Sequence, residues 1–169
     1  RTFELLSRHL NLLTHYQERF RYILVDEFQD TSVLQYQWIR MLAGSNGCVF
    51  GVGDDDQSIY GWRGAEIANL LDLEKHFPEV KIVKLEQNYR STNTILNAAN
   101  ALIKHNVRRR PKQLWSQKGQ GTKIALRAYE TDEDEAREVV AGIEFARLAH
   151  RVTWAQNAIL FRTNLQARA

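Results

Sequence analysis

The stretch GDDDQSIYGWRGA, residues 53–65, directly follows an apolar run at residues 48–52. Because the run is short and apolar, it predicts a buried β-strand. Three glycines and several polar and aromatic side chains then crowd together, a composition that a packed core does not require. In open α/β sheets, ligands bind in the crevice at the carboxyl ends of the strands. We therefore expect residues 53–65 to form a ligand-binding loop at such an edge.

Four side chains of this loop suggest what the ligand is. Gln57 and Arg63 are suited to an anionic group, and Tyr60 and Trp62 offer flat faces on which a nucleic-acid base can stack. Each also has a plainer explanation: a turn hydrogen bond for the amide, core packing for the aromatic rings and a surface ion pair for the arginine. The three acids at 54–56 could hold a cation, cap a helix or stay solvated. The residues alone leave these alternatives open.

The flanking sequence alternates strand-like runs with amphipathic helices. The expected strands are 21–25, 48–52, 81–85, 124–128 and 158–161, and the apolar run in 21–25 predicts burial on both faces. The expected helices are 3–18, 32–43, 67–77, one through 95–103 and one capped by Thr131. Ser32 and Gln35 have the spacing of a capping box, and Gly44 is the expected stop of that helix. Such alternation predicts an α/β fold with parallel βαβ units and right-handed crossovers.

The charge distribution divides the chain. Residues 1–85 contain nine Lys or Arg against twelve Asp or Glu, whereas residues 86–169 contain fourteen against eight. We therefore expect a boundary between two lobes at 85/86. Between Glu86 and Glu130 there is no acid, but nine basic residues occur, largely in an expected loop at 105–121. A field of one sign favours a polyanionic partner, although a solvated basic face is the plainer alternative.

Composition narrows the class of protein. Hydrophobic residues at 44% and charged residues at 25% are ordinary for a globular protein. No apolar run approaches the roughly 18 residues of a membrane span, so we expect no membrane partner. The single Cys48 favours a reducing, cytoplasmic location, and the five histidines lack metal-ligand spacing. Because the chain begins at Arg1, we expect it to be a piece of a longer polypeptide.

A second motif, DEFQD at residues 26–30, follows the apolar run 21–25. Nucleotide hydrolases use an apolar strand ending in Asp-Glu to hold Mg²⁺ and activate water. Asp26 would then bind the metal, and Glu27 would accept a proton from the attacking water. Arg63 and Arg90 are the candidates for an arginine that stabilises transition-state charge. A purely structural role, in which the acids only end the strand, fits the same residues.

Four motifs together resemble a known family. ILVDEFQDTS (23–32), VGDDDQSIYGWRGA (52–65), LEQNYRST (85–92) and AILFRTNLQAR (158–168) resemble consecutive motifs of the superfamily 1 DNA helicases, in particular the UvrD/PcrA/Rep group. Their order and their coverage of nearly the whole chain are far more specific than any one motif. The resemblance implies a parallel-sheet RecA-like (P-loop NTPase) motor fold. Residues 1–85 would be the C-terminal part of a first RecA-like domain, and residues 86–169 the N-terminal part of a second, with ATP between them.

The resemblance also implies a role for each matching residue. Asp26 resembles the Mg²⁺ ligand, Glu27 the catalytic base and Gln57 the sensor of the γ-phosphate. Arg63 and Arg90 resemble the arginines that reach this phosphate, and Tyr89 resembles the residue that stacks on adenine. Tyr60, Trp62, Arg162 and Asn164 resemble residues that contact single-stranded DNA.

The implied function is that of an ATP-dependent DNA helicase. Such an enzyme uses ATP and Mg²⁺ to move 3′→5′ on single-stranded DNA and to unwind duplexes at single-/double-strand junctions, in DNA repair or replication and with repair proteins as possible partners. The alternatives are the motor subunit of a helicase–nuclease and a non-catalytic nucleic-acid-binding module. The chain has no G-x-x-x-x-G-K-[ST] phosphate loop. We therefore expect these residues to be inactive alone.

Overall fold

The computed structural model describes residues 1–45, 47–77 and 79–168. It divides into two compact units, Arg1–Thr122 and Lys123–Ala169, and each is described by itself. Residues 86–122 therefore pack with the residues that precede them. The division at 122/123 reflects contacts within this chain, whereas the boundary expected at 85/86 separates parts of two RecA-like domains. The boundary at 85/86 therefore stays a prediction.

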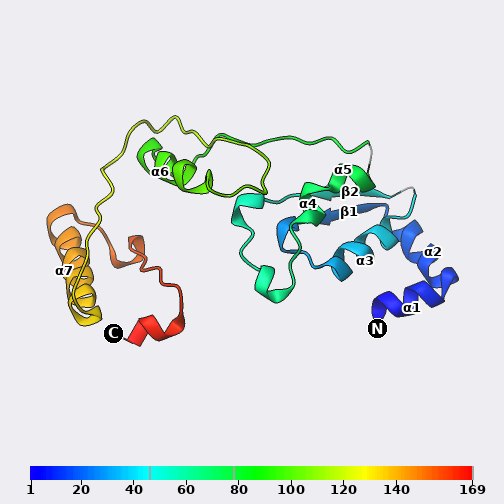
Figure 1. Ribbon diagram of the computed structural model, residues 1–169, viewed down its shortest axis with the longest axis horizontal. Helices are drawn as coiled ribbons and strands as arrows, with labels where there is room; N and C mark the ends of the chain where they lie inside the picture. The colour runs from blue at the N-terminus through cyan, green and yellow to red at the C-terminus, as the bar shows by residue number, and fades with distance from the viewer. Residues whose placement is uncertain (46, 78, 169) are drawn as a thin grey trace. The chain divides into compact units, whose positions relative to one another are not determined.

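The first unit is built on a two-stranded parallel sheet (Figure 1). Strand β1 (Tyr22–Val25) pairs with β2 (Cys48–Gly51), with Tyr22 opposite Cys48 and Val25 opposite Gly51. Helix α3 (Val33–Ala43) connects the two strands. This βαβ unit confirms the strands expected at 21–25 and 48–52 and the mixed α/β class. Because the strands are parallel, their carboxyl ends lie at the same edge.

Helix α3 begins and ends as its sequence predicts. The Ser32 side chain accepts a hydrogen bond from the Gln35 backbone N–H, and the Gln35 side chain accepts one from the Ser32 backbone N–H. Gly44 ends the helix with a φ of +56°, in the region that favours glycine. Tyr36, Ile39 and Ala43 are buried, so this helix places one apolar face in the core.

Phe28 is the centre of the small core. It has no exposed surface, and its ring lies edge-on to Tyr36. The burial expected for strands β1 and β2 is wrong, because Tyr22 and Leu24 of β1 are 77% and 75% exposed and Phe50 of β2 is 62% exposed. Alternate side chains of a strand point to opposite faces. In the part of the chain that is described, only one face of β1 is covered.

Two expected helices are interrupted. The helix expected at 3–18 is two helices, α1 (Thr2–Arg8) and α2 (Leu10–Arg19), which meet at His9 in a non-helical conformation. The helix expected at 67–77 is likewise divided at Asp72 into α4 (Ala68–Leu71) and α5 (Leu73–His76). Neither break falls at a proline or glycine, so hydrophobic periodicity gives no sign of it.

Helix α6 (Asn93–Ile103) is held by the irregular segment that follows it. Its Asn93 side chain donates to the Ser116 backbone carbonyl and accepts from the Ser116 N–H, at 2.8 and 2.9 Å. Asn100 makes the same pair of bonds with Leu114, at 2.8 and 3.1 Å. Each asparagine side chain therefore satisfies the backbone N–H and C=O of one residue in this segment, as a paired strand would do in a sheet. The loop expected at 105–121 is confirmed as irregular.

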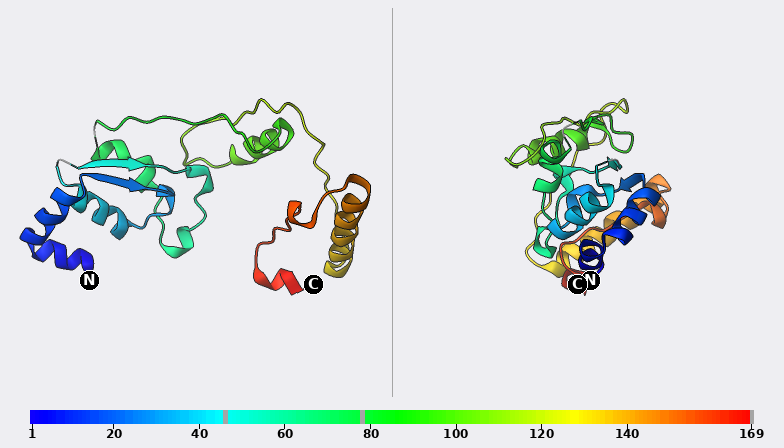
Figure 2. Two further views of the ribbon diagram at one scale, coloured as in Figure 1. Left: turned by 180° about the vertical axis from the view of Figure 1, so that it is seen from behind. Right: turned by 90° about the vertical axis from the view of Figure 1, so that its right-hand side faces the viewer.

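The second unit contains one long helix, α7 (Asp132–His150), visible from behind in Figure 2. Thr131 caps it, as expected, by accepting a hydrogen bond from the Asp134 N–H at 3.1 Å. Short 3-10 turns, Trp154–Gln156 and Asn164–Arg168, follow.

Three further strands were expected, at 81–85, 124–128 and 158–161, and the structure has none there. Their apolar side chains are exposed, as at Leu85 (81%), Leu126 (97%) and Leu160 (93%). A strand needs a neighbour that pairs with its N–H and C=O groups. These segments find no such neighbour among the described residues, so β-propensity alone does not make them strands. No helix among those residues is long and apolar enough to cross a bilayer.

Candidate functional site

The end of β1 presents two acids to solvent. Asp26 and Glu27 are both exposed, and the Glu27 backbone N–H donates to Asp26 Oδ1 at 2.9 Å. Glu27 has a φ of +47°, which is uncommon for a residue other than glycine and often marks a functional turn. This conformation leads the chain from the end of β1 into the 3-10 turn Phe28–Asp30. The two carboxylates are thereby held at the carboxyl end of the strand.

Gln29 joins this strand end to the next one. Its side chain is 1% exposed; Nε2 donates to Glu27 Oε2 at 2.8 Å, and Oε1 accepts from the Asp54 backbone N–H at 3.0 Å. A hydrogen bond to a charged group typically contributes about 1.5–3 kcal/mol. Sequence reasoning missed this residue, although a glutamine inside an acidic motif after a strand was a usable signal. Gln29 fixes the distance between the two strand ends.

Gly53 makes room for this bridge. A Cβ atom at residue 53 would lie 2.8 Å from Gln29 Oε1 and 3.2 Å from the Phe28 backbone nitrogen. Both atoms are held in place, the first by its hydrogen bond and the second because the Phe28 N–H donates to the Val52 carbonyl at 2.9 Å. The glycine therefore permits the close approach of residues 28 and 29 to the loop that follows β2.

The acids at 54–56, here called the acid turn, are neither free nor solvated. Asp54 caps the 3-10 turn Asp55–Gln57 by accepting from the Asp56 N–H at 3.0 Å, and it also accepts from Gln57 Nε2 at 2.7 Å. Lys112 Nζ lies 2.6, 3.0 and 2.9 Å from carboxylate oxygens of Asp54, Asp55 and Asp56. Of the three roles considered from the sequence, capping is confirmed for Asp54. An ammonium of the same chain occupies the place where a cation was considered.

Arg109 completes this cluster. Its Nε and Nη2 each donate to Asp56 at 2.7 Å, and the two side chains are only 12% and 13% exposed. The hydrogen bonds from Arg109 lower the pKa of Asp56 against the opposing effect of burial, and Lys112 lowers it further. Burial acts to lower the pKa of Lys112, but hydrogen bonds to the three carboxylates together raise it. The charged forms of Asp56 and Lys112 are therefore both stabilised.

Part of the basic stretch is paired with acids of the same chain, so the stretch is not a free basic face. Among the described residues, four of its nine basic side chains form ion pairs within the chain. Arg109 and Lys112 bind the acid turn, Arg110 Nη2 lies 2.8 Å from Glu74 Oε2, and Arg127 Nη1 lies 3.2 Å from Glu138 Oε2. The hydrogen bond from Arg110 lowers the pKa of Glu74 and so favours its charged form. Sequence composition counts charges but cannot show which of them are already paired. The positive field available to a polyanion is correspondingly smaller.

The loop beyond the acid turn brings three predicted site residues together. The Tyr60 and Trp62 rings have centroids 6.4 Å apart, and the Arg63 guanidinium lies 5.3 and 5.6 Å from them. Trp62 is 77% exposed. Cation–π contacts of this kind contribute about 0.5–1 kcal/mol at exposed sites. The residues expected to stack on bases are thus exposed, and Arg63 lies against them.

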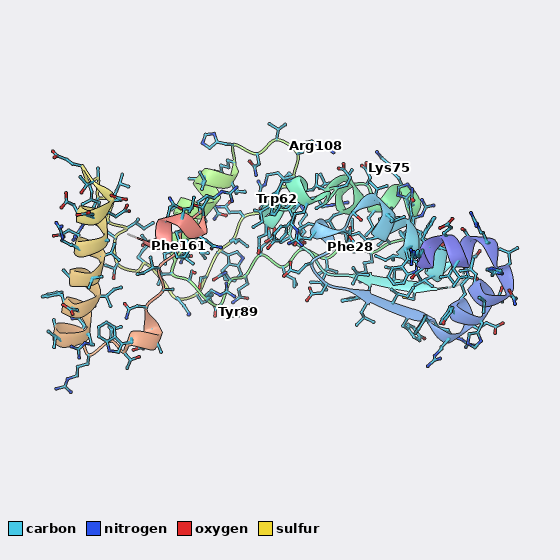
Figure 3. All side chains as sticks on the ribbon, turned by 90° about the horizontal axis from the view of Figure 1, so that it is seen from below. Phe28, Trp62, Lys75, Tyr89, Arg108 and Phe161 are labelled. Atoms are coloured by element: carbon cyan, nitrogen blue, oxygen red, sulfur yellow. The ribbon has the colours of Figure 1, made fainter. Side chains whose placement is uncertain are left out.

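Tyr89 and Arg90 lie in an exposed turn of the same unit. The Asn88 side chain accepts from the Arg90 and Ser91 backbone N–H groups, and Lys118 Nζ donates to the Arg90 carbonyl at 2.8 Å. Tyr89 is 74% exposed and points away from its ribbon, in contrast to Phe28 among its packed neighbours (Figure 3). Among the described residues, no hydrogen bond or ion pair joins the Arg90 guanidinium to Glu27.

Arg162 and Asn164 belong to the second unit. Both are exposed, and the Arg162 backbone N–H donates to Gln166 Oε1 at 2.8 Å. Their predicted contact with DNA stays a prediction.

The chemistry of the strand ends fits Mg²⁺ and a nucleotide. Mg²⁺ prefers oxygen ligands and is usually bound by one or two carboxylates together with phosphates and water. Asp26 offers such a carboxylate in an exposed position, and the neighbouring Glu27 carboxylate is fixed by Gln29 and available as a proton acceptor. Gln57 is exposed and held on Asp54 at the end of the neighbouring strand. The residues therefore fit a metal–phosphate group bound at this edge.

Comparison with known proteins agrees with this chemistry. Residues 1–78 match the family model of the UvrD/REP helicase N-terminal domain, and residues 83–169 match that of the UvrD-like helicase C-terminal domain. The chain is 49% identical to DNA helicase II of Escherichia coli, 47% to a probable DNA helicase II homolog of Rickettsia conorii and 44% to the ATP-dependent DNA helicase PcrA of Leuconostoc citreum. These alignments cover 98–99% of this chain but only 22–25% of the relatives. The chain belongs to the family of UvrD-like helicases.

Proposed function

We propose that this chain is the central part of a longer ATP-dependent DNA helicase. The observation that carries the proposal is the bridge by Gln29 between Glu27, at the end of β1, and Asp54, after the end of β2. The bridge holds Glu27, the predicted general base, and the loop of Gln57, the predicted phosphate sensor, at one edge of the sheet. α/β proteins bind ligands at this edge. The relatives named as DNA helicases support the same assignment.

In the proposed reaction, ATP and Mg²⁺ bind at this edge. The bound Mg²⁺ would neutralise developing charge on the phosphates. Asp26 holds the metal through its exposed carboxylate, and Glu27 accepts the proton of the attacking water. Gln57 reports the presence of the terminal phosphate, Arg63 and Arg90 stabilise its charge, and Tyr89 stacks on the adenine.

The loop 57–63 links this chemistry to DNA. Tyr60 and Trp62 stack on bases of the single strand, while Gln57 lies only a few residues before them on the same loop. Small shifts at a phosphate are amplified where a packed interface has two discrete arrangements. We propose that ATP binding closes a cleft between the two RecA-like domains and that a base moves past Trp62 as it closes. Hydrolysis then reopens the cleft. Arg162 and Asn164 contact the same strand, and repeated steps give 3′→5′ translocation and unwinding at junctions.

We further propose two RecA-like lobes, 1–85 and 86–169, each completed by other parts of the longer protein. The exposed apolar segments 81–85, 124–128 and 158–161 support this, because strands of such lobes are buried when paired. A cytoplasmic enzyme of DNA repair or replication, with repair proteins as partners, fits the assignment. Since these residues include no phosphate loop, the chain alone does not hydrolyse ATP at a helicase-like rate.

The test is the substitution Glu27→Gln in the longer protein. Loss of the general base should lower the rate of ATP turnover about 10²–10⁴-fold, while the affinity for single-stranded DNA is retained. Glu18→Gln, at an exposed position of α2, is the matched control and leaves turnover unchanged. Turnover that survives Glu27→Gln would refute the hydrolase assignment and favour a non-catalytic nucleic-acid-binding module.

A further inference from the structure

The acid turn and the basic segment 109–112 form a closed cluster next to Gln57. Lys112 is 14% exposed and touches all three carboxylates, and Arg109 binds Asp56 with two hydrogen bonds. The two partners are far apart in the sequence and belong to the regions matched by different family models. Removing one member of such a pair is costly because the remaining charge is left without compensation. The cluster therefore joins two regions of the chain at a fixed geometry.

Asp54 is where this cluster meets the proposed site. Its Oδ1 accepts from Lys112 Nζ, its Oδ2 accepts from Gln57 Nε2, and its backbone N–H donates to Gln29. A single carboxylate thus holds the Gln57 amide on one side and the Lys112 ammonium on the other. Asp54 Oδ1 also accepts from the Asp56 backbone N–H at 3.0 Å. If Lys112 is lost, Oδ1 keeps only this weaker bond to a neutral donor. The carboxylate is then less firmly oriented, and it is the side-chain partner of Gln57 among the described residues.

The segment that begins at Lys112 continues to the turn that carries Arg90. Leu114 is clamped by Asn100 of α6 and Ser116 by Asn93 of the same helix. Lys118 Nζ then donates to the Arg90 carbonyl at 2.8 Å. Residues 112–118 are therefore attached at one end to the acid turn and at the other end to the Arg90 turn.

We propose that Lys112 is a positioning residue for ATP hydrolysis. By holding Asp54, it orients the amide of Gln57, and through residues 112–118 it links that amide to the turn bearing Arg90. Its effect on turnover rests on the proposed function, whereas its effect on Gln57 does not. In this proposal Lys112 acts through its contact with Asp54.

The first experiment uses the chain as it stands and records the side-chain ¹⁵N–¹H₂ NMR signals of Gln57. Lys112→Met shifts or broadens these signals, and Lys112→Arg largely restores them. Lys75, labelled in Figure 3, forms an exposed pair with Asp72. The control Lys75→Met therefore removes the same charge and should leave the Gln57 signals in place. If Lys112→Met does not fold, the double substitution Asp55→Asn with Lys112→Met reduces the uncompensated charge and gives the same readout. Unchanged Gln57 signals would overturn the positioning role.

The second experiment measures DNA-stimulated ATP turnover in the longer protein. Lys112→Met lowers kcat about tenfold, since small misplacements of a catalytic group are costly, while KM for ATP changes less than about threefold. Lys112→Arg recovers most of kcat, and Lys75→Met has no effect. A kcat that is retained although the Gln57 signals move would refute the role in turnover. A wild-type protein without ATPase would overturn the proposed function instead, and the NMR signals would still decide whether Lys112 positions Gln57.

Discussion

The buried amide of Gln29 accepts a hydrogen bond from the Asp54 backbone N–H at 3.0 Å, and these two residues, 25 apart in the sequence, tie together the segments that follow β1 and β2. Replacing Gln29 with Ala leaves this N–H and the Glu27 carboxylate without their partner. Because an unsatisfied buried donor costs about 1–3 kcal/mol, we expect the free energy of unfolding to fall by about 2 kcal/mol. Urea denaturation measures this directly. Gln37→Ala, at an exposed position of α3, is the control, and equal losses for both variants would contradict the bridge.

A substitution at Gly53 tests the contact between Gln29 and the loop that follows β2. In Gly53→Ala the new Cβ lies 2.8 Å from Gln29 Oε1, so either the amide or the loop must move. Overpacking of this kind costs about 1–3 kcal/mol. Gly61→Ala is the matched control because no atom lies within 4 Å of its added Cβ. Thermal unfolding of both variants should show a lower Tm only for Gly53→Ala, and a Gly53→Ala protein as stable as wild type would show that the approach is not tight.

The substitution Trp62→Ala tests whether the loop 57–63 contacts single-stranded DNA. Its side chain is 77% exposed, so Trp62→Ala should change the stability of the chain by less than about 0.5 kcal/mol. Loss of one stacking platform weakens single-stranded DNA binding by about 1–3 kcal/mol, or roughly 5- to 150-fold in Kd. Fluorescence anisotropy with a labelled oligothymidylate measures this change. Trp154→Ala, which removes another exposed indole, should not weaken binding. If both variants bind equally well, the loop is not the stacking surface.

The ion pair between Arg109 and Asp56 makes a pH-dependent contribution to stability. The folded-state pKa of Asp56 is lower than the ordinary value of 3.8, because the hydrogen bonds from Arg109 favour the carboxylate. The contribution is therefore fully present above about pH 4 and is lost as the pH falls through the folded pKa. The charged groups that face this pair are Asp54, Asp55, Arg110 and Lys112.

Arg109→Ala measures that contribution. At pH 7 we expect it to destabilise the chain by about 2 kcal/mol, between the values typical of exposed and buried pairs. The difference from wild type should shrink as the pH falls from about 4 towards 2, since Asp56 becomes protonated in both proteins. Urea unfolding across this range gives the curve. Arg8→Ala, whose pair with Glu4 is exposed, is the control. A difference that stays constant down to pH 2 would exclude the ion pair as its source.

The predictable part of the structure is the part governed by local sequence. The capping box of α3, the Thr131 cap of α7 and the two strands that pair with each other follow from short patterns and are confirmed. The expected strands at 81–85, 124–128 and 158–161 failed because pairing depends on a neighbour that no local pattern supplies. The Gln29 bridge and the Lys112 cluster were not anticipated for a similar reason. Their partners are distant in the sequence, and only the folded chain brings them together.

The most direct test of the account is a crystal structure of the longer protein with Mg²⁺, a non-hydrolysable ATP analogue and a single-stranded oligonucleotide. The account predicts Asp26 on the metal, the Gln57 amide and the Arg90 guanidinium within hydrogen-bond distance of the terminal phosphate and Trp62 stacked on a base. Gln57 and Arg90 turned away from the phosphate, with the nucleotide bound elsewhere than at the ends of β1 and β2, would contradict it.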